Sequence, residues 1–284
     1  MDVKEDIREF LTSRRARVKP EDAGLPAHKG RRRVLGLRRE EVALLAGISV
    51  EYYTRIERGN VAGVSEDIME GIATALRLDD AERAHLFDLV RTASMSAGRT
   101  PRRRPSQERV RPAVKQILES ISAPAYVRNG RLDILAANPL GEALYAPLMQ
   151  GDSGSPPNMA RFVFLDDDAT RFFAQWDGIA SDVVAILRAE AGRDPYDRRL
   201  SDLVGELSTR SAEFRVRWAA HNVKFHRTGA KRLHHPIVGP LTLAYEVLEL
   251  AGDGQRILIY TAEPQSASED ALALLASWSA SVPS

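Results

Sequence analysis

Residues 49–58 carry side chains whose types and spacing suit contact with duplex DNA rather than covalent chemistry. If this range forms a helix, Tyr53 and Ile56 are three residues apart and face inward as apolar anchors. Four side chains then lie on the outward face, where they could reach base edges in a major groove: Val50, Glu51, Tyr52 and Arg55. Ser49 and the free backbone amides at the start of such a helix are available to a phosphate group. The pattern therefore indicates recognition by hydrogen bonds and charge.

The residues just before this segment predict the first half of a helix-turn-helix. A helix over 38–46 would place Ala43 where the second helix crosses closely, and a small residue is needed at that crossing. Gly47 permits the positive φ angle that the turn requires, and Ile48 would fill the turn from the inside. The alternative is that these helices belong to a bundle that binds another protein, as an adaptor would.

Cations gather in two clusters around this motif, although the formal net charge of the chain is only +1. Six cations and no acid lie between residues 29 and 39, and six cations with one acid lie between 99 and 111. One such cluster is often a solvated loop. Two of them beside a helix-turn-helix pattern predict a polyanionic partner, double-stranded DNA.

The segment resembles the lambda-repressor-like (XRE) helix-turn-helix family through three strings, Val42-Ala43, Ala46-Gly47-Ile48-Ser49 and Ile56-Glu57-Arg58-Gly59. The resemblance implies DNA contacts from Arg39, Ser49, Val50, Glu51, Tyr52, Arg55 and Arg58, and the neighbouring Arg38 joins this candidate set. The family usually has Gln where Arg39 stands, so we expect Arg39 to bind the phosphate backbone. Glu57 corresponds to an acid that pairs with an arginine of the first helix, here Arg14 or Arg15, which is a structural role.

Helical periodicity without any strand pattern predicts an all-α domain over residues 1–95. The expected helices cover 6–17, 38–46, 49–58, 65–78 and a range that begins at Asp79 or Asp80, with Ser65 as an N-cap. Residues 96–111 combine Pro, Ser and Gly with arginines, which predicts a basic linker.

Residues 112–284 predict an α+β domain, an antiparallel sheet with helices on one side, of which PAS-like domains are an example. Asn129-Gly130-Arg131 between two short extended runs indicates a hairpin of strands 125–128 and 132–136. Three further strands are expected at 231–238, 241–249 and 256–261. Helices are expected at 112–121, 138–145, 168–191, 197–220 and 268–281, the second of them capped by Asn138.

The whole chain also resembles the MmyB-like regulators. The resemblance rests on the strings 31–43, 52–55, 78–83 and 131–138 and on matches at 214–218, His221, Lys231-Arg232, His235-Pro236 and 260–264. It implies a PAS-like ligand-binding domain in the C-terminal half, and a fatty acid has been associated with that family. Ala137 stands where the family commonly has Trp, so the identity of the ligand is not carried over.

A ligand pocket of this kind is apolar with a few polar anchors. Our candidate ligand-binding residues are Asn138, Phe164, Phe172, Trp176, Trp218, His221 and Tyr245. Arg215, Lys231 and His234 are further groups that could engage a carboxylate or a carbonyl. The alternatives are that the aromatic side chains form the core and that Asn138 only caps its helix.

Several functional classes are disfavoured by what the sequence lacks. The chain has no Cys, which excludes disulfides, thiolate nucleophiles and Cys-based zinc sites. Four of the six histidines lie between 221 and 235, but their spacing suits neither one helix face nor one strand face, so we expect no metal. No phosphate-binding Gly loop, G-x-S-x-G or H-E-x-x-H occurs, so an enzyme in the C-terminal domain is only an alternative.

The charged N-terminus and the lack of a long apolar run favour a cytoplasmic protein that binds no membrane. We therefore expect a DNA-binding transcription regulator that senses a small, fatty-acid-like or other apolar effector and needs no other cofactor. A homodimer is expected on geometric grounds, because one short helix reads few base pairs.

Overall fold

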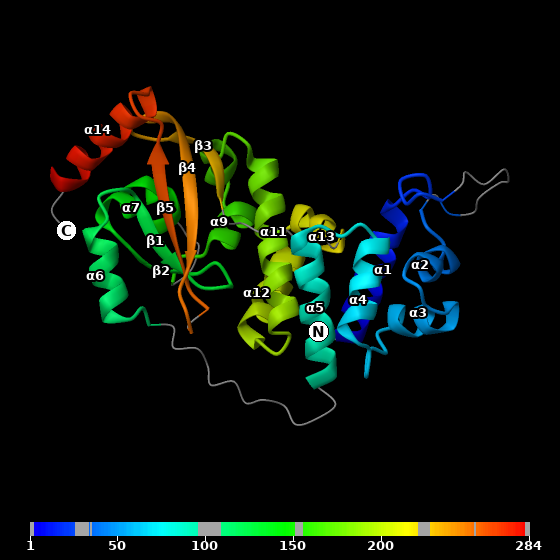
Figure 1. The fold of residues 1–284 in the computed structure, drawn as a ribbon. Coiled ribbons are helices and arrows are strands. Elements are labelled where there is room, and N and C mark those ends of the chain that lie inside the picture. The colour runs from blue at the N-terminus through cyan, green and yellow to red at the C-terminus, as the bar shows by residue number, and fades with distance from the viewer. Residues whose placement is uncertain are drawn as a thin grey trace. The chain divides into compact units, whose positions relative to one another are not determined.

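The computed structural model describes residues 3–25, 34, 36–95, 109–150, 156–220, 228–252 and 254–281 (Figure 1). The chain divides into two compact units. The N-terminal unit comprises residues 1–102 together with 188–201 and 218–224, and the C-terminal unit comprises 103–187, 202–217 and 225–284. Residues 29–33 of the predicted basic cluster 29–39 and residues 96–108 of the predicted basic linker 96–111 lie outside the described residues.

Helices build the described part of the N-terminal unit, as predicted. They are α1 (Val3–Arg17), α2 (Arg39–Leu45), α3 (Val50–Glu57), α4 (Glu66–Ala75) and α5 (Asp80–Met95). Their inward faces share one apolar core, which includes Ile7, Phe10, Tyr53, Ile56, Ile72 and Leu86. Burial of these side chains supplies most of the stabilisation that short helices lack by themselves.

The predicted helix starts are confirmed. Ser49 accepts a hydrogen bond from the backbone N–H of Tyr52 at 3.1 Å, and Ser65 caps α4 in the same way. At α5, the Asp79 side chain accepts from the Glu82 amide while the Glu82 side chain accepts from the Asp79 amide. Each cap satisfies a backbone donor that has no partner inside its helix.

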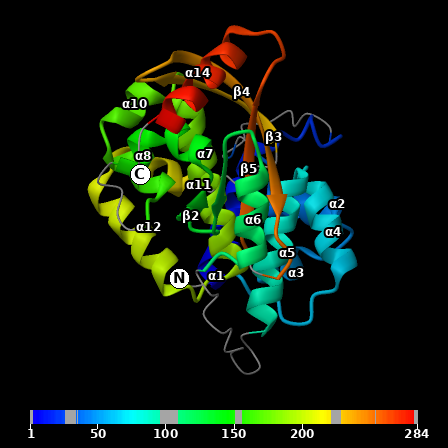
Figure 2. The ribbon, with the colours of Figure 1, turned by 90° about the vertical axis from the view of Figure 1, so that its left-hand side faces the viewer.

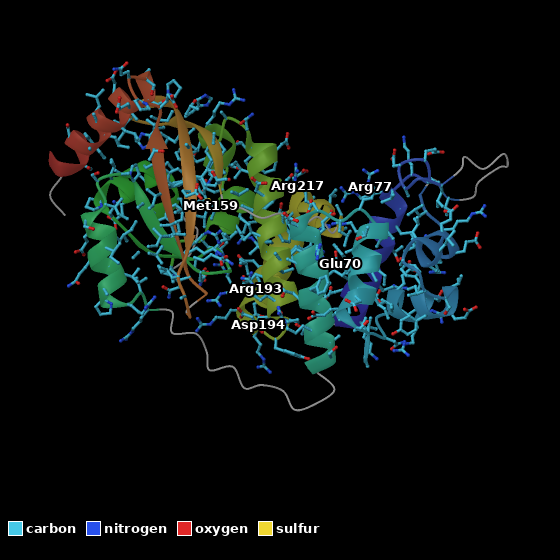
Figure 3. The ribbon with its side chains drawn as sticks, in the orientation of Figure 1. Glu70, Arg77, Met159, Arg193, Asp194 and Arg217 are labelled. Carbon is cyan, nitrogen blue, oxygen red and sulfur yellow. The ribbon has the colours of Figure 1, made fainter. Side chains whose placement is uncertain are left out.

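Two side chains hold α4 within this unit (Figure 3). Glu70 forms an ion pair with Arg83 of α5. Arg77 follows α4 with a φ of 51° and donates to the carbonyl of Asp22 in the turn after α1. These contacts connect α4 to α5 and to the turn that follows α1.

Two glycines allow close approach to α1. A Cβ atom on Gly36 would lie 2.4 Å from the carbonyl oxygen of Arg15, and one on Gly59 would lie 2.6 Å from the Cα of Lys4. Gly59 also has a φ of +79°, which other residues rarely adopt. Larger side chains at either position would push the backbone of α1 away.

An antiparallel sheet organises the C-terminal unit. Its strands are β1 (Ala125–Arg128), β2 (Ile134–Ala137), β3 (Thr228–His235), β4 (Gly239–Glu249) and β5 (Arg256–Ala262), in the order β2-β1-β5-β4-β3. The predicted α+β class is confirmed, and so is the hairpin of β1 and β2. In its loop, Leu132 rather than Gly130 has a positive φ, at 70°.

Helices cover both faces of this sheet, whereas the sequence predicted helices on one side. On one face, α6 (Pro112–Ser120) packs Val114 and Leu118 against Ala125 and Val127 of β1. On the other face, Tyr126 of β1 contacts Tyr145, which follows α7 (Pro139–Leu144). All four residues of β1 are therefore buried, which is the pattern of a strand covered on both sides. The last helix, α14 (Ala267–Ser281), packs against α7 and β4 (Figure 2).

The helices between the hairpin and β3 differ most from the prediction. The structure adds α8 (Ala146–Gln150) and α9 (Met159–Leu165) and divides each of the two long predicted helices in two. The first becomes α10 (Asp168–Phe172) and α11 (Trp176–Arg193), because Phe173 leaves the helix to form a bridge with Leu233 of β3. The second becomes α12 (Arg198–Arg210) and α13 (Ala212–Ala219), because Ser211 caps the amide of Phe214 at 3.1 Å.

Candidate functional site

The turn between α2 and α3 has the geometry that a helix-turn-helix requires. Ala43 is buried, and its carbonyl accepts the amide of Ile48 at 3.0 Å. Gly47 has the predicted positive φ, at +68°. The turn therefore fixes α3 at a set angle across α2.

The two faces of α3 separate as predicted. Tyr53 and Ile56 are fully buried, while the opposite side of the helix is open to solvent. The exposed or half-buried candidates on this side are Ser49, Val50, Glu51, Tyr52, Arg55 and Arg58. Half-buried Thr54, one turn after Val50, belongs to the same side and was missed by the sequence prediction, although its spacing of four residues could have identified it.

Arg55 also organises the loop that follows α3. Its guanidinium donates to the carbonyls of Asn60 at 3.2 Å and Ala62 at 2.8 Å. The same group lies 5.2 Å from the ring centroid of Tyr52, within the range of a cation–π contact. The exposed side of α3 and the loop 58–64 thus form one continuous surface.

Glu57 is a buried carboxylate that holds two arginines. It is 1% exposed, and its oxygens pair with Arg15 Nε at 2.7 Å and with Arg39 Nε. Of the two predicted partners in α1, Arg15 is correct, because Arg14 pairs with Glu82 at 2.9 Å instead. The Arg39 side chain remains half exposed, and its ion pair with Glu57 fixes the direction in which it points.

The hydroxyl of Tyr53 approaches the same carboxylate. It donates to Glu57 Oε1 at 3.2 Å, and burial together with the charge of Glu57 raises the pKa of Tyr53 above its ordinary value. Tyr53 therefore stays neutral and remains a donor. Nearby, the backbone N–H of Arg38 donates to Glu41 at 2.7 Å, and the Arg38 side chain pairs with Glu40.

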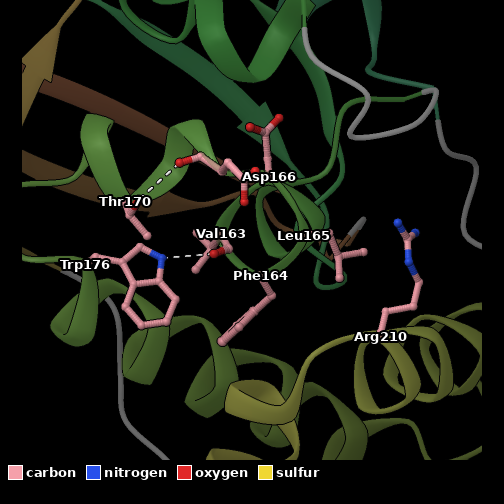
Figure 4. A pocket seen from close by; sticks show the side chains of 8 residues that line it. Val163, Phe164, Leu165, Asp166, Thr170, Trp176 and Arg210 are labelled. Carbon is pink, nitrogen blue, oxygen red and sulfur yellow. Dashed lines mark hydrogen bonds between the residues drawn. The ribbon is translucent and has the colours of Figure 1, made fainter.

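Two of the predicted ligand-binding residues share a cleft in the C-terminal unit (Figure 4). Phe164 and Trp176 have ring centroids 6.1 Å apart, and the Trp176 indole N–H donates to the carbonyl of Val163 at 2.9 Å. The cleft has a volume of about 330 Å³ and is also lined by Leu165, Asp166, Asp167, Thr170 and Arg210. Its acidic and basic rim makes it more polar than an apolar ligand prefers.

Phe172 and Tyr245 lie instead in a buried aromatic cluster. The cluster is on the face of the sheet that carries Tyr126, which we call the inner face. The ring of Tyr145 lies 5.7 Å from Phe172 and 5.6 Å from Tyr260, and Tyr245 lies 6.0 Å from Tyr260. The hydroxyls of Tyr145 and Tyr260 are 2.8 Å apart. The cluster therefore combines apolar walls with a few buried polar groups.

Lys231 extends into this aromatic cluster. Its Nζ donates to the hydroxyl of Tyr260 at 2.9 Å and to that of Tyr145 at 3.4 Å. Burial, reinforced by the charge of Arg128 and opposed by that of Asp182, lowers the pKa of Lys231 to about 7. The alternation of buried and exposed residues along β3 places Lys231, which the sequence analysis named as a possible anchor for a carboxylate, on this inner face.

Asn138 is a structural residue of the sheet and of α7. Its Oδ1 accepts the amides of Ala125 at 3.0 Å and Gly141 at 2.8 Å, and its Nδ2 donates to the carbonyls of Ile121 and Ala123, each at 2.8 Å. The predicted cap is confirmed. Because both side-chain atoms are engaged with backbone, Asn138 has nothing left to offer a ligand.

The remaining candidate ligand-binding residues lie neither in the cleft nor in the aromatic cluster. Trp218 belongs to the N-terminal unit, where Arg188 lies 4.2 Å from its ring centroid. His221 lies outside the described residues. Arg215 and His234 are exposed. Over the described parts of the chain, no three His, Asp or Glu side chains are grouped so that they could hold a metal ion.

A helix-turn-helix with a polar, open recognition helix, and a separate sheet domain with a buried polar and aromatic cluster, define a transcription regulator with a ligand-binding domain. The chain belongs to the family of MmyB-like transcription regulators, because the model of that family's ligand-binding domain matches residues 110–275. A helix-turn-helix domain model matches residues 7–86. Both matches confirm the predicted architecture. Comparison with curated proteins gives no match. None of the described helices is long and apolar enough to cross a membrane.

Proposed function

We propose that this regulator binds a specific DNA site as a homodimer and that a small apolar effector in the C-terminal unit changes its affinity for that site. The observation that carries the DNA-binding part is the division of α3. Fully buried Tyr53 and Ile56 hold the inner face of α3 in the core. The outer face therefore keeps a single orientation when it meets a DNA groove. Such preorganisation limits the entropy that binding costs.

Each side chain of this surface has a task in the proposal. Val50, Glu51, Tyr52 and Arg55 meet base edges in the major groove, where donor and acceptor patterns differ between base pairs. Ser49 and the first amides of α3 approach a phosphate. Arg38, Arg39 and Arg58 contact the phosphate backbone of the DNA. The ion pair with Glu57 holds the Arg39 side chain in the direction that this contact needs. A second copy supplies the other half-site, since eight residues of helix read only a few base pairs.

The connection between the two functions runs through α11. This helix begins at Trp176 in the C-terminal unit, and its last residues, from Arg188, belong to the compact N-terminal unit. There Gly192 lies against His85 of α5, where an added Cβ would be 2.5 Å from the imidazole. We propose that an effector which repacks the start of α11 shifts this end of the helix and thereby the placement of the DNA-binding surface.

The test is selection of bound duplexes from a random pool by the full chain, followed by binding curves on the selected and a scrambled duplex. Arg39→Ala is expected to weaken both duplexes alike and to lower the salt dependence by about one unit, because one phosphate contact is lost. Arg91→Ala, an exposed arginine on α5, is the matched control and should change neither. A protein that ignores every duplex at low ionic strength would refute the proposal.

A further inference from the structure

The outer face of the sheet, which is the face on which α6 packs, is covered only in part. α6 covers β1 and the part of β5 around Ile257. Its cover ends between two cross-strand neighbours, because Ile257 is 4% exposed and Leu248 beside it on β4 is 48% exposed. Every second residue of β4 from Pro240 to Leu248 is exposed, so no described element covers the outer face there.

Short side chains line the centre of this open face. Ala230 of β3 and Ala244 of β4 are direct cross-strand neighbours, and Thr261 of β5 lies beside Ala244 on its other side. All three residues are exposed. Alanine is uncommon in strands, because it has little side chain to pack there. Two adjacent alanines on an open face therefore leave room for the close approach of a second surface.

Two opposite charges flank the alanine pair. Arg232 lies two residues after Ala230 on β3, and Glu246 lies two residues after Ala244 on β4. Because these strands are antiparallel, the two charges lie on opposite sides of the alanines, about 14 Å apart along the strands. Both side chains are exposed, and neither forms an ion pair with a residue that the structure describes. The open face thus carries one free charge of each sign, too far apart to pair within one chain.

A two-fold axis would convert this arrangement into two ion pairs. The axis lies parallel to the sheet and crosses the strands at the alanine pair, so that two copies meet face to face. Arg232 of each copy then lies over Glu246 of the other, and the strands of the two sheets cross at a small angle, as in packed sheets. A surface that is complementary to itself in this way meets the condition for an isologous dimer.

The free edge of β3 is less suited to association than the face. The amide of Ala174 already donates to the carbonyl of Arg232 at 3.0 Å, and Phe173 forms a bridge with Leu233. The backbone groups in the middle of this edge are therefore engaged, and a second copy could not extend the sheet there.

We propose that two copies of the chain associate through the outer face of β3 and β4, with Arg232 of each copy paired to Glu246 of the other and the alanines at the centre. The inference rests on the proposed function in one respect, since it names the interface of the homodimer proposed there. The association itself needs neither DNA nor an effector. The open face is small for a protein interface, so the dimer is expected to dissociate reversibly on dilution.

The test is analytical ultracentrifugation of the full chain, without DNA, over a range of concentrations. Arg232→Glu and Glu246→Arg each bring like charges together twice in a dimer, so each should weaken self-association about tenfold or more. An equimolar mixture of the two variants should regain the affinity of the wild type as a mixed dimer, because both of its contacts again join opposite charges. Arg198→Glu and Asp202→Arg, exposed on α12, are the matched controls and should change nothing.

A cross-link tests the position of the axis. The chain has no Cys, so Ala244→Cys provides a single thiol. This thiol is expected to lie close to its counterpart in the second copy, and a short bismaleimide should therefore join two copies covalently. Asp202→Cys, on α12 instead of the sheet, should remain uncross-linked under the same conditions.

Three results would overturn the inference: the wild type stays monomeric at every concentration, the dimer persists unchanged in both single variants, or their mixture associates no better than either variant alone. A dimer that persists in both variants leaves the proposed function intact, since it would form through another surface. A chain that dimerises as expected but selects no duplex would refute DNA binding and leave this interface standing. The two failures are therefore distinguishable.

Discussion

The carboxylate of Glu57 at the end of α3 joins Arg39 at the start of α2 to Arg15 near the end of α1. One oxygen pairs with Arg15 Nε at 2.7 Å and the other with Arg39 Nε. Because Glu57 is buried, this link connects three helices and at the same time directs a cation that we place on the DNA backbone. In the proposed DNA complex, the stability of the fold and the affinity for DNA are therefore coupled at this single side chain.

Glu57→Gln should lower the free energy of unfolding by about 1–3 kcal/mol, since it leaves Arg15 without its counter-charge in a largely buried place. It should also weaken binding to all DNA sequences, because the Arg39 side chain is no longer held in position to contact a phosphate. Chemical denaturation and binding curves measure the two effects. Glu40→Gln, exposed on α2, is the control, and an equal loss of stability in both variants would contradict the role of Glu57.

Arg55→Ala should weaken binding to the specific duplex by about 1–3 kcal/mol and relax the preference at one base-pair position. The structure adds a second effect, because Arg55 also holds the carbonyls of Asn60 and Ala62. Arg55→Lys, which keeps the charge but not the bidentate donor geometry, should therefore recover only nonspecific affinity. Equal losses on specific and random duplexes would show that Arg55 positions the loop and reads no base.

Asn138→Ala should destabilise the protein by about 2–3 kcal/mol, because two backbone amides and two carbonyls lose their buried partner. Thermal or urea unfolding measures this loss. Gln116→Ala, exposed on α6, provides the reference.

His235 predicts a loss of stability in mild acid. Burial lowers its pKa below the ordinary value of 6.5, although the hydrogen bond to the carbonyl of Ala143 opposes this shift. Its Nδ1 accepts the amides of Ile237 and Val238, so a proton on that atom would face two donors. The unfolded chain therefore takes up a proton near pH 6.5 before the folded protein does. Its contribution to stability is complete above that pH and is lost as the pH falls through the lower, folded-state pKa.

Urea unfolding between pH 8 and pH 5 measures this dependence. His235→Gln should flatten the decline below about pH 6.5, while His234→Gln, exposed on the same strand, should leave it unchanged. An unaltered decline in His235→Gln would assign the acid sensitivity to other groups.

Local patterns predicted the geometry of α3 and of the turn before it well, because these features are local. The cap at Ser49, the positive φ of Gly47 and the buried pair Tyr53 and Ile56 all follow from residues within one or two turns. The strands of the C-terminal unit were also predicted within a few residues, since their alternation is visible along the chain.

Contacts distant in sequence account for what the sequence did not predict. The break at Phe173 exists because a strand far along the chain offers a bridging partner, Leu233. Lys231 was considered as an anchor for a carboxylate, but its environment depends on three tyrosines from other elements. Periodicity places a residue on a face, and it does not tell which side chains of other elements meet it there.

Gly36 and Gly59 flank the α2–α3 pair, and they touch α1 at its opposite ends, beside Arg15 and Lys4. The α2–α3 pair, which includes the helix that we propose reads DNA, is in this way held against α1 at both of its ends and can tilt or slide only together with α1. In the proposed mechanism, the effector therefore leaves α3 itself unbent. It changes the position of the whole helix-turn-helix domain, and in the proposed dimer it thereby changes the spacing between the two copies of α3 along the duplex.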